Sequence, residues 1–310
     1  MEQTGQQEKP KRRSEARFVL HLLRANPLVL IGSILALGSV VLGLISPFLV
    51  DPKAWQTIDF SIAKCWNNPI INWHIANIYT CPGTTKYPLG TDAYGRDLWQ
   101  MIVLAIPTDL QVAFEIVGGA FIIGVTVGAL AAYAGGIVDE AILRITDIFF
   151  AFPVLSLAIV LVTIGAHTLA WLTLAVFIVW WPTYVRLARS QILSEKEKPY
   201  VEALRAMGAG RLRIIFRHLL PNSVYPMLVQ ASLDIGGVIL TFSGLMFLGF
   251  GPSPMLAELG NLVNDGITKA SVQTAPWIVL FPGLAILLIA FGFNLLGDGI
   301  RDILDPRLRR

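Results

Sequence analysis

Six long apolar stretches constrain the fold of this chain more than any other feature of its sequence. A helix needs about 20 apolar residues to cross the hydrocarbon core of a bilayer. Stretches of about this length lie at residues 28–50, 110–135, 141–165, 168–185, 224–250 and 276–296. Each is continuous rather than alternating, which favours helices over the strands of a membrane β-barrel. The sequence therefore predicts an all-α integral membrane protein with six transmembrane helices.

The composition supports this prediction. Hydrophobic residues make up 55% of the 310 residues and charged residues 15%, whereas an ordinary soluble domain is about 25% charged. The first stretch is longer than the ~7–15 apolar residues of a secretory signal, so we expect a retained helix. The net charge of +3 is small, and no nucleic-acid partner is indicated.

The placement of lysine and arginine predicts the orientation of the chain. Residues 1–27 carry six of them, residues 186–217 carry eight, and the tail from residue 301 carries four. Six spans place these segments on one side, and the opposite side holds five. Because cytoplasmic segments are enriched in lysine and arginine, we expect a multi-pass protein of the cell membrane with both termini in the cytoplasm.

The spans divide the chain into a cytoplasmic segment, a first helix, an external loop, a five-helix core and a cytoplasmic tail. The boundaries are 1–27, 28–50, 51–109, 110–297 and 298–310, with a cytoplasmic loop at 186–221 inside the core. The external loop holds the chain's two cysteines, Cys65 and Cys81. A disulfide between them is the favoured interpretation, because both lie outside the membrane. Two free thiols are the alternative.

The cytoplasmic loop contains a short helix with recognisable start and stop signals. Pro199 suits a first helical turn, and Glu202 lies near the positive end of the helix dipole. Gly208 and Gly210 then interrupt the helix, and a second amphipathic stretch leads into the fifth span. Such a helix either docks on a cytoplasmic partner or lies on anionic lipid, and its residue types alone leave both interpretations open.

This loop resembles the EAA loop of ABC-importer permeases. The residues that carry the resemblance are Glu202, Ala203, Gly208, Leu220 and Pro221, at the spacing of the family motif. Leu204 stands where the motif has a second alanine, and His218 where it has isoleucine. The location between the fourth and fifth spans also matches the family. The resemblance implies the type I ABC-importer permease fold, with a cytoplasmic coupling helix.

Three further motifs resemble the dipeptide/oligopeptide branch of these permeases. Residues 88–97 read PLGTDAYGRD, and residues 144–153 read RITDIFFAFP. Residues 294–307 read NLLGDGIRDILDPR, which is similar to the end of the second permease of that branch. The resemblance spans about residues 15–308 and implies transport of short peptides. Oligosaccharides or a metal chelate are the alternative cargo.

The resemblance also implies a set of partners. They are a homologous second permease, two cytoplasmic ATPase subunits that bind ATP and Mg, and an external substrate-binding protein. By resemblance, the residues at the ATPase contact are Glu202, Ala203, Leu204, Gly208 and Pro221. The chain itself lacks the Gly-x-x-x-x-Gly-Lys-[Ser/Thr] phosphate loop, so we expect no enzymatic activity and no cofactor in this subunit.

Carboxylates inside apolar spans are costly and usually face a partner or a wet cavity. Asp109, Glu115 and Asp234 are candidates to line the pathway or to hold a neighbouring helix. Asp109 and Glu115 could make an acidic vestibule suited to a neutral polyol or a cation, or pair with the partner permease. Arg144 and Asp147 are three residues apart, which predicts an ion pair on one helix face.

The second span also contains a signal for close helix packing. Gly124 and Gly128 form a small-xxx-small pattern that lets helices approach closely.

An intramembrane enzyme would need a nucleophile paired with a base, which the spans do not offer. The scattered histidines and the two external cysteines make no credible metal site. A channel would need neither an ATPase nor a coupling helix.

Overall fold

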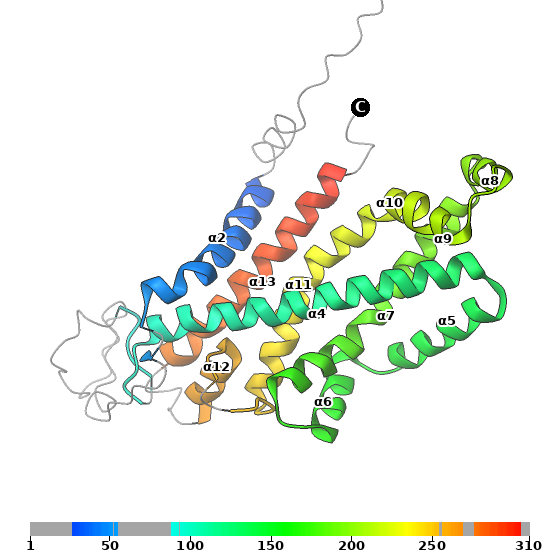
Figure 1. The fold of residues 1–310 in the computed structure, drawn as a ribbon. Coiled ribbons are helices and arrows are strands. Elements are labelled where there is room, and N and C mark those ends of the chain that lie inside the picture. Colours follow the sequence, from blue (N-terminus) through cyan, green and yellow to red (C-terminus); the bar gives the residue numbers. More distant parts are fainter. Residues whose placement is uncertain are drawn as a thin grey trace, which may run out of the picture.

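The computed structural model describes most of the chain after the N-terminal segment. The described residues are 27–51, 53–54, 88–92, 94–253, 256–268 and 276–304. Cys65 and Cys81 lie outside these ranges, so their pairing stays a prediction. Figure 1 shows the described part as an elongated bundle in which α8 and α12 lie at opposite ends.

Every regular element in the described residues is a helix. The elements are α2 (Pro27–Leu49), α4 (Leu98–Ala134), α5 (Gly136–Phe150), α6 (Val154–Ile164), α7 (Leu169–Lys196), α8 (Pro199–Ala206), α9 (Arg211–Ile214), the π-helical segment η3 (Ile215–Leu219), α10 (Leu220–Ser223), α11 (Tyr225–Phe247), α12 (Leu259–Thr268) and α13 (Trp277–Leu304). Five of them (α2, α4, α7, α11 and α13) are long and apolar enough to cross a membrane. The α5–α6 pair brings the total to six if it counts as one span. The all-α, multi-pass prediction is confirmed.

The predicted third span, 141–165, is not one straight helix. α5 and α6 meet at an angle of 90°. Pro153 caps α6 in an extended conformation, with φ −60° and ψ 134°. Proline has no N–H to continue a helix and pushes the preceding residue out of the helical region. A hydropathy window cannot register this break, because the residues on both sides are apolar.

Two predicted boundaries are also corrected. The external loop does not run to residue 109, because α4 begins at Leu98, where the Asp97 carboxylate accepts a hydrogen bond from the Trp99 N–H at 3.0 Å. At 37 residues, α4 is roughly 55 Å long and exceeds the ~30 Å hydrocarbon core. The predicted tail from residue 298 is helical as far as Leu304, because α13 continues past the apolar run.

Close packing between α4 and α7 forms the centre of the bundle. Gly124 and Gly128 lie on the α4 face that contacts α7, so the predicted close helix approach is confirmed. α13 packs between α2 and α11 (Figure 1). The outer face of α2 is strongly apolar and open, with Leu44 72% and Phe48 89% exposed, as expected of a surface that faces lipid.

Candidate coupling site and buried charged groups

The short helix α8 begins at the proline that the sequence marks. Lys198 precedes the helix in an extended conformation, and Pro199 occupies its first turn. The Val201 N–H donates to the Lys198 carbonyl at 3.0 Å. Glu202 lies in the first turn, where its carboxylate interacts favourably with the helix dipole. The predicted start of the helix is confirmed.

The end of α8 is a Schellman motif centred on Gly208. The Ala209 N–H donates to the Leu204 carbonyl at 3.0 Å, and the Gly208 N–H donates to the Arg205 carbonyl at 2.9 Å. This pair of bonds requires a left-handed residue between the helix and the following chain. Gly208 supplies it with φ +77°. The chain then turns sharply into α9.

The inner face of α8 is fixed to the ends of α4 and α7. Val201 is fully buried in a cluster with Ala129 and Ala132 of α4 and Ile192 of α7. Leu204 packs against the same cluster. α8 thus shares one apolar cluster with both long helices.

Polar contacts add to this attachment. The Tyr200 hydroxyl donates to Glu195 Oε1 at 3.0 Å, and Lys198 Nζ lies 2.6 Å from Glu195 Oε2. This contact with Glu195 raises the pKa of Lys198. Lys196 Nζ donates to the carbonyls of Ala132 and Tyr133, each at 3.2 Å. A cation at the C-terminal end of α4 also complements the dipole of that helix.

The outer face of α8 is open. Glu202, Ala203 and Gly208 are exposed. Met207 is 74% exposed, and Leu212 at the start of α9 is 63% exposed. We call these five residues the α8 surface. It combines a carboxylate, a small residue and two large apolar side chains at one tip of the molecule (Figure 1).

The other residues of the EAA-like stretch do not belong to the α8 surface. Pro221 lies in the first turn of α10 and is exposed, 13 positions beyond Gly208. Between them, η3 is a π-helix, a rare form that often marks functional sites. Leu204 faces inward, so it belongs to the attachment of α8 rather than to the open face.

The two predicted carboxylates of α4 point into different environments. Asp109 is buried and faces Glu258, and its Oδ2 accepts a hydrogen bond from the Leu259 N–H at 3.2 Å. Glu115 is exposed and accepts a hydrogen bond from Gln111 Nε2 at 2.8 Å. The structure therefore does not bring Asp109 and Glu115 together.

Asp234 lies inside the bundle, between α11 and α7. Its Oδ1 accepts a hydrogen bond from Gln230 Nε2 at 2.9 Å. Tyr184 and Trp180 of α7 are its neighbours across the helix interface. Asp234 therefore lies at the contact between α11 and α7.

The predicted ion pair between Arg144 and Asp147 is wrong. Arg144 pairs with Glu140 on the preceding turn of α5 at 2.8 Å, and both side chains are exposed. Asp147 pairs with Arg186 of α7. Spacing along one helix could not reveal this, because the partner of Asp147 comes from a helix 39 positions away.

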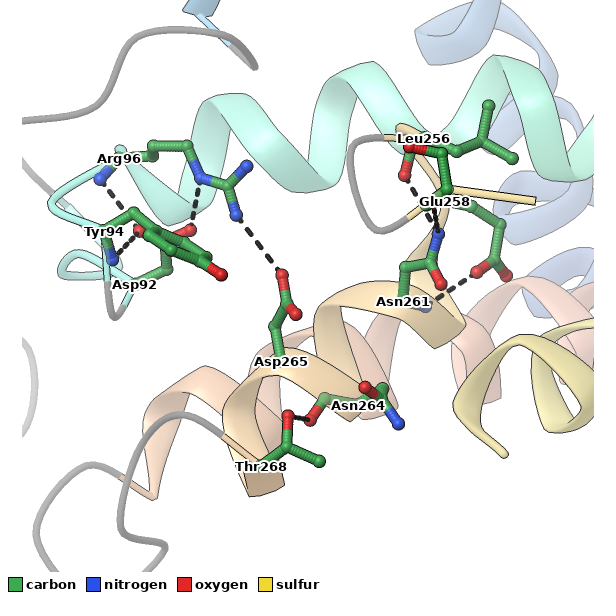
Figure 2. Close-up of polar contacts among 10 residues, drawn as sticks. Asp92, Tyr94, Arg96, Leu256, Glu258, Asn261, Asn264, Asp265 and Thr268 are labelled. Atoms are coloured by element: carbon green, nitrogen blue, oxygen red, sulfur yellow. Dashed lines mark hydrogen bonds and ion pairs between the residues drawn. The ribbon is translucent and has the colours of Figure 1, made fainter. Parts of the chain in front are cut away.

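A buried ionic network at the α12 end was missed. Figure 2 shows Arg96 between Asp92 and Asp265: its Nε donates to Asp92 Oδ2 at 2.5 Å, and its Nη2 lies 3.5 Å from Asp265 Oδ2. All three side chains are almost fully buried. The PLGTDAYGRD motif supplies Asp92 and Arg96, but nothing in the sequence indicates their partner Asp265. Glu258 was also missed, because it lies outside every predicted span.

Together, the apolar helices and the attached α8 define a multi-pass helical membrane protein. A solved structure of the inward-facing MetNI methionine ABC transporter shares this fold: its TM-score is 0.50 at 22% identity, and the match covers 67% of this chain and 98% of that one. The chain thus has the type I permease fold of ABC importers.

The sequence comparisons place the chain within one family. The profile of the binding-protein-dependent transport system inner membrane component matches residues 124–310, and the chain belongs to this family. It is 38% identical to the dipeptide transport system permease protein DppC of Alkalihalophilus pseudofirmus, over 93% of this chain and 88% of that protein. It is 43% identical to DppC of Escherichia coli K12, over 74% and 75% of the two chains. A glutathione transport permease, GsiD of Pectobacterium atrosepticum, is 41% identical over 71% and 73%.

Proposed function

We propose that this chain is one of two permease subunits of an ABC importer for short peptides, and that the α8 surface docks on a cytoplasmic ATPase subunit. The observation that carries the proposal is the pairing of an open outer face on α8 with an inner face buried against α4 and α7. A helix that only lay on lipid would not need attachment to two spans. Movement of an ATPase against α8 would pass directly into the two helices at the centre of the bundle.

The placement of charge supports the orientation in this proposal. The basic segments at 1–27, 186–217 and the C-terminus lie on the cytoplasmic side by the positive-inside rule. α8 lies within the second of these segments. The proposed partners are a second permease, two ATPase subunits that bind ATP and Mg, and an external binding protein that delivers the substrate.

The proposed cargo follows from the relatives. Those with 38% and 43% identity are named as dipeptide permeases, and one with 41% identity is named for glutathione, itself a tripeptide. Short peptides are the chemistry that these names share. Uptake of labelled di- and tripeptides by cells that express the complete system tests this assignment. Competition by an oligosaccharide, without competition by unlabelled peptide, would contradict it.

Docking is tested by reversing one charge on the α8 surface. We expect Glu202→Arg to remove the ATPase subunits from the complex purified in mild detergent while the second permease stays bound. The folding of α8 should survive, because the lost dipole interaction is worth only about 0.3–1 kcal/mol and the inner face is unchanged. Mass spectrometry of the co-eluting proteins provides the measurement.

Glu140→Arg is the matched control for this experiment. Glu140 is an exposed carboxylate on α5 whose ion-pair partner among the described residues is the exposed Arg144, and it lies outside the α8 surface. We expect this variant to retain every subunit. Full retention of the ATPases by Glu202→Arg would contradict docking through α8.

A further inference from the structure

The N-terminus of α12 holds two buried carboxyl groups that come from distant parts of the chain. Glu258 caps the helix, because its Oε2 accepts a hydrogen bond from the Asn261 N–H at 2.7 Å (Figure 2). Asp109 of α4 accepts a hydrogen bond from the N–H of Leu259, the first residue of α12, at 3.2 Å. Both side chains are almost completely buried, with 1% or less exposed.

The two carboxyl groups meet at the N-terminus of α12, where they accept hydrogen bonds from N–H groups two positions apart. Each has one oxygen, Asp109 Oδ1 and Glu258 Oε1, with no hydrogen-bond donor among the described residues. No lysine, arginine or histidine in the described part of the chain forms an ion pair with either group. Two ionised carboxylates at this distance, away from water, would repel strongly.

The surroundings favour one negative charge here, not two. The N-terminus of a helix carries a partial positive charge and stabilises a single anion. Two backbone N–H groups already serve Asp109 Oδ2 and Glu258 Oε2. The Ser243 hydroxyl beside Glu258 can donate to only one of the two remaining oxygens. A proton on either carboxyl group supplies the donor for the other.

A metal ion does not fit this position. Among the described residues, this position has three buried side-chain oxygens without a partner: Asp109 Oδ1, Glu258 Oε1 and the Ser243 hydroxyl. Calcium takes six to eight oxygen ligands, and magnesium requires near-octahedral coordination. The backbone is also in tight contact, because a β carbon on Gly260 would lie 2.2 Å from the Ser243 carbonyl oxygen. A proton needs no such space.

We propose that Asp109 and Glu258 hold a single proton between their facing carboxyl groups, so that the N-terminus of α12 is a proton-binding site that holds α12 against α4. The site lies at the opposite end of the molecule from α8 (Figure 1) and is independent of the proposed docking. Loss of the proton would leave two like charges in contact and separate the two helices.

The other ionisable groups on the neighbouring elements interact with residues outside this site. Asp265, on the same helix, belongs to the network of Arg96 and Asp92 at the start of α4. Asp234 lies nine positions before Ser243 on α11 and interacts with Gln230 and with Tyr184 of α7. The groups that interact with Asp109 and Glu258 are each other, backbone N–H groups at the start of α12, and Ser243.

Infrared spectroscopy of the complete complex in lipid nanodiscs at pH 7 tests the proposal directly. We expect a C=O stretching band from a protonated carboxyl group that shifts in D₂O. Both Asp109→Asn and Glu258→Gln should abolish the same band, because the new amide N–H donates to the remaining carboxylate and leaves it ionised. Glu115→Gln is the matched control on α4, and it should keep the band because Glu115 is exposed.

The pattern of loss distinguishes the alternatives. If the two carboxyl groups were protonated independently, each substitution would remove only half of the band. If a cation were bound instead of a proton, the wild-type complex would show no such band. Either result would overturn the proposal. A thermal stability of the complex that depends on sodium, potassium or calcium, in buffers matched for ionic strength, would also overturn it.

Thermal stability provides a second measurement. The folded chain keeps a proton that an unfolded carboxyl group releases above pH ~4. Stability from this site should therefore fall as the pH rises, by about tenfold in the folding equilibrium per pH unit while the proton is held. From pH 7 to 10, we expect the melting temperature of the wild-type complex to decline more steeply than that of Asp109→Asn. Parallel curves for the two would contradict a shared proton.

Discussion

Gly128 of α4 lies directly against the carbonyl of Val185 on α7. A β carbon built on Gly128 would be 2.4 Å from the Val185 oxygen and 3.0 Å from Ala188 Cβ. The obstacle is backbone, which cannot move aside as the end of a flexible side chain can. This close contact between α4 and α7 therefore depends on the absence of a side chain at this position.

Gly128→Ala should destabilise the protein because α4 and α7 must separate. Overpacking of this kind costs about 1–3 kcal/mol, and thermal unfolding in detergent measures it. Gly118→Ala is the control, since a β carbon on Gly118, also in α4, meets nothing within 4 Å. That variant should be neutral or stabilising by up to ~1 kcal/mol. Equal effects of the two substitutions would contradict the packing argument.

Gly208→Ala should strain the end of α8 without creating a clash. A β carbon there meets no atom within 4 Å, but φ is +77°, which costs an L-residue about 1–2 kcal/mol. We expect weaker uptake and faster proteolysis of the loop after α8. Gly210→Ala provides the control, because Gly210 has equal space and φ −66°. If both variants transport normally and resist protease equally, the Schellman turn is not important for coupling.

Arg189→Ala should weaken the attachment of α5 to α7. Arg189 makes two hydrogen bonds to Asp139, Nε to Oδ1 and Nη2 to Oδ2, both at 2.7 Å, in a partly buried site. A bond to a charged group is worth about 1.5–3 kcal/mol. Arg144→Ala, which removes an exposed pair, should cost roughly 0–0.5 kcal/mol. The two melting temperatures provide the comparison, and a larger loss for Arg144→Ala would refute this ranking.

Arg96→Met should be among the most damaging substitutions at the α12 end. It leaves Asp92 and Asp265 buried without their cation, a change that costs about 3–5 kcal/mol in buried pairs. Adding Asp265→Asn should recover part of the loss, because one unpaired charge disappears. Lys53→Met, which removes an exposed positive charge, should have little effect. Thermal unfolding of the purified complex measures these effects. If adding Asp265→Asn recovered no stability, the result would argue against the network.

Local patterns in the sequence predicted the elements whose causes are local. The apolar stretches gave five spans and the position of a sixth, because the cost of backbone in lipid depends only on a continuous run of about 20 residues. Pro199 and Gly208 predicted both ends of α8, because each acts through its own φ angle. Gly124 and Gly128 predicted close packing, but not that α7 is the partner.

Only the tertiary structure decided which residues meet across the bundle. Asp109 and Glu258 are 149 positions apart, and Arg96 and Asp265 are 169 apart. Asp147 pairs with α7 rather than with Arg144. The 90° bend between α5 and α6 also escaped the hydropathy pattern. The sequence determined which segments enter the membrane, because burial in lipid is a property of each segment alone. The pairing of charges depended on the fold, because a buried charge is stabilised by whatever group the packing of other helices places beside it.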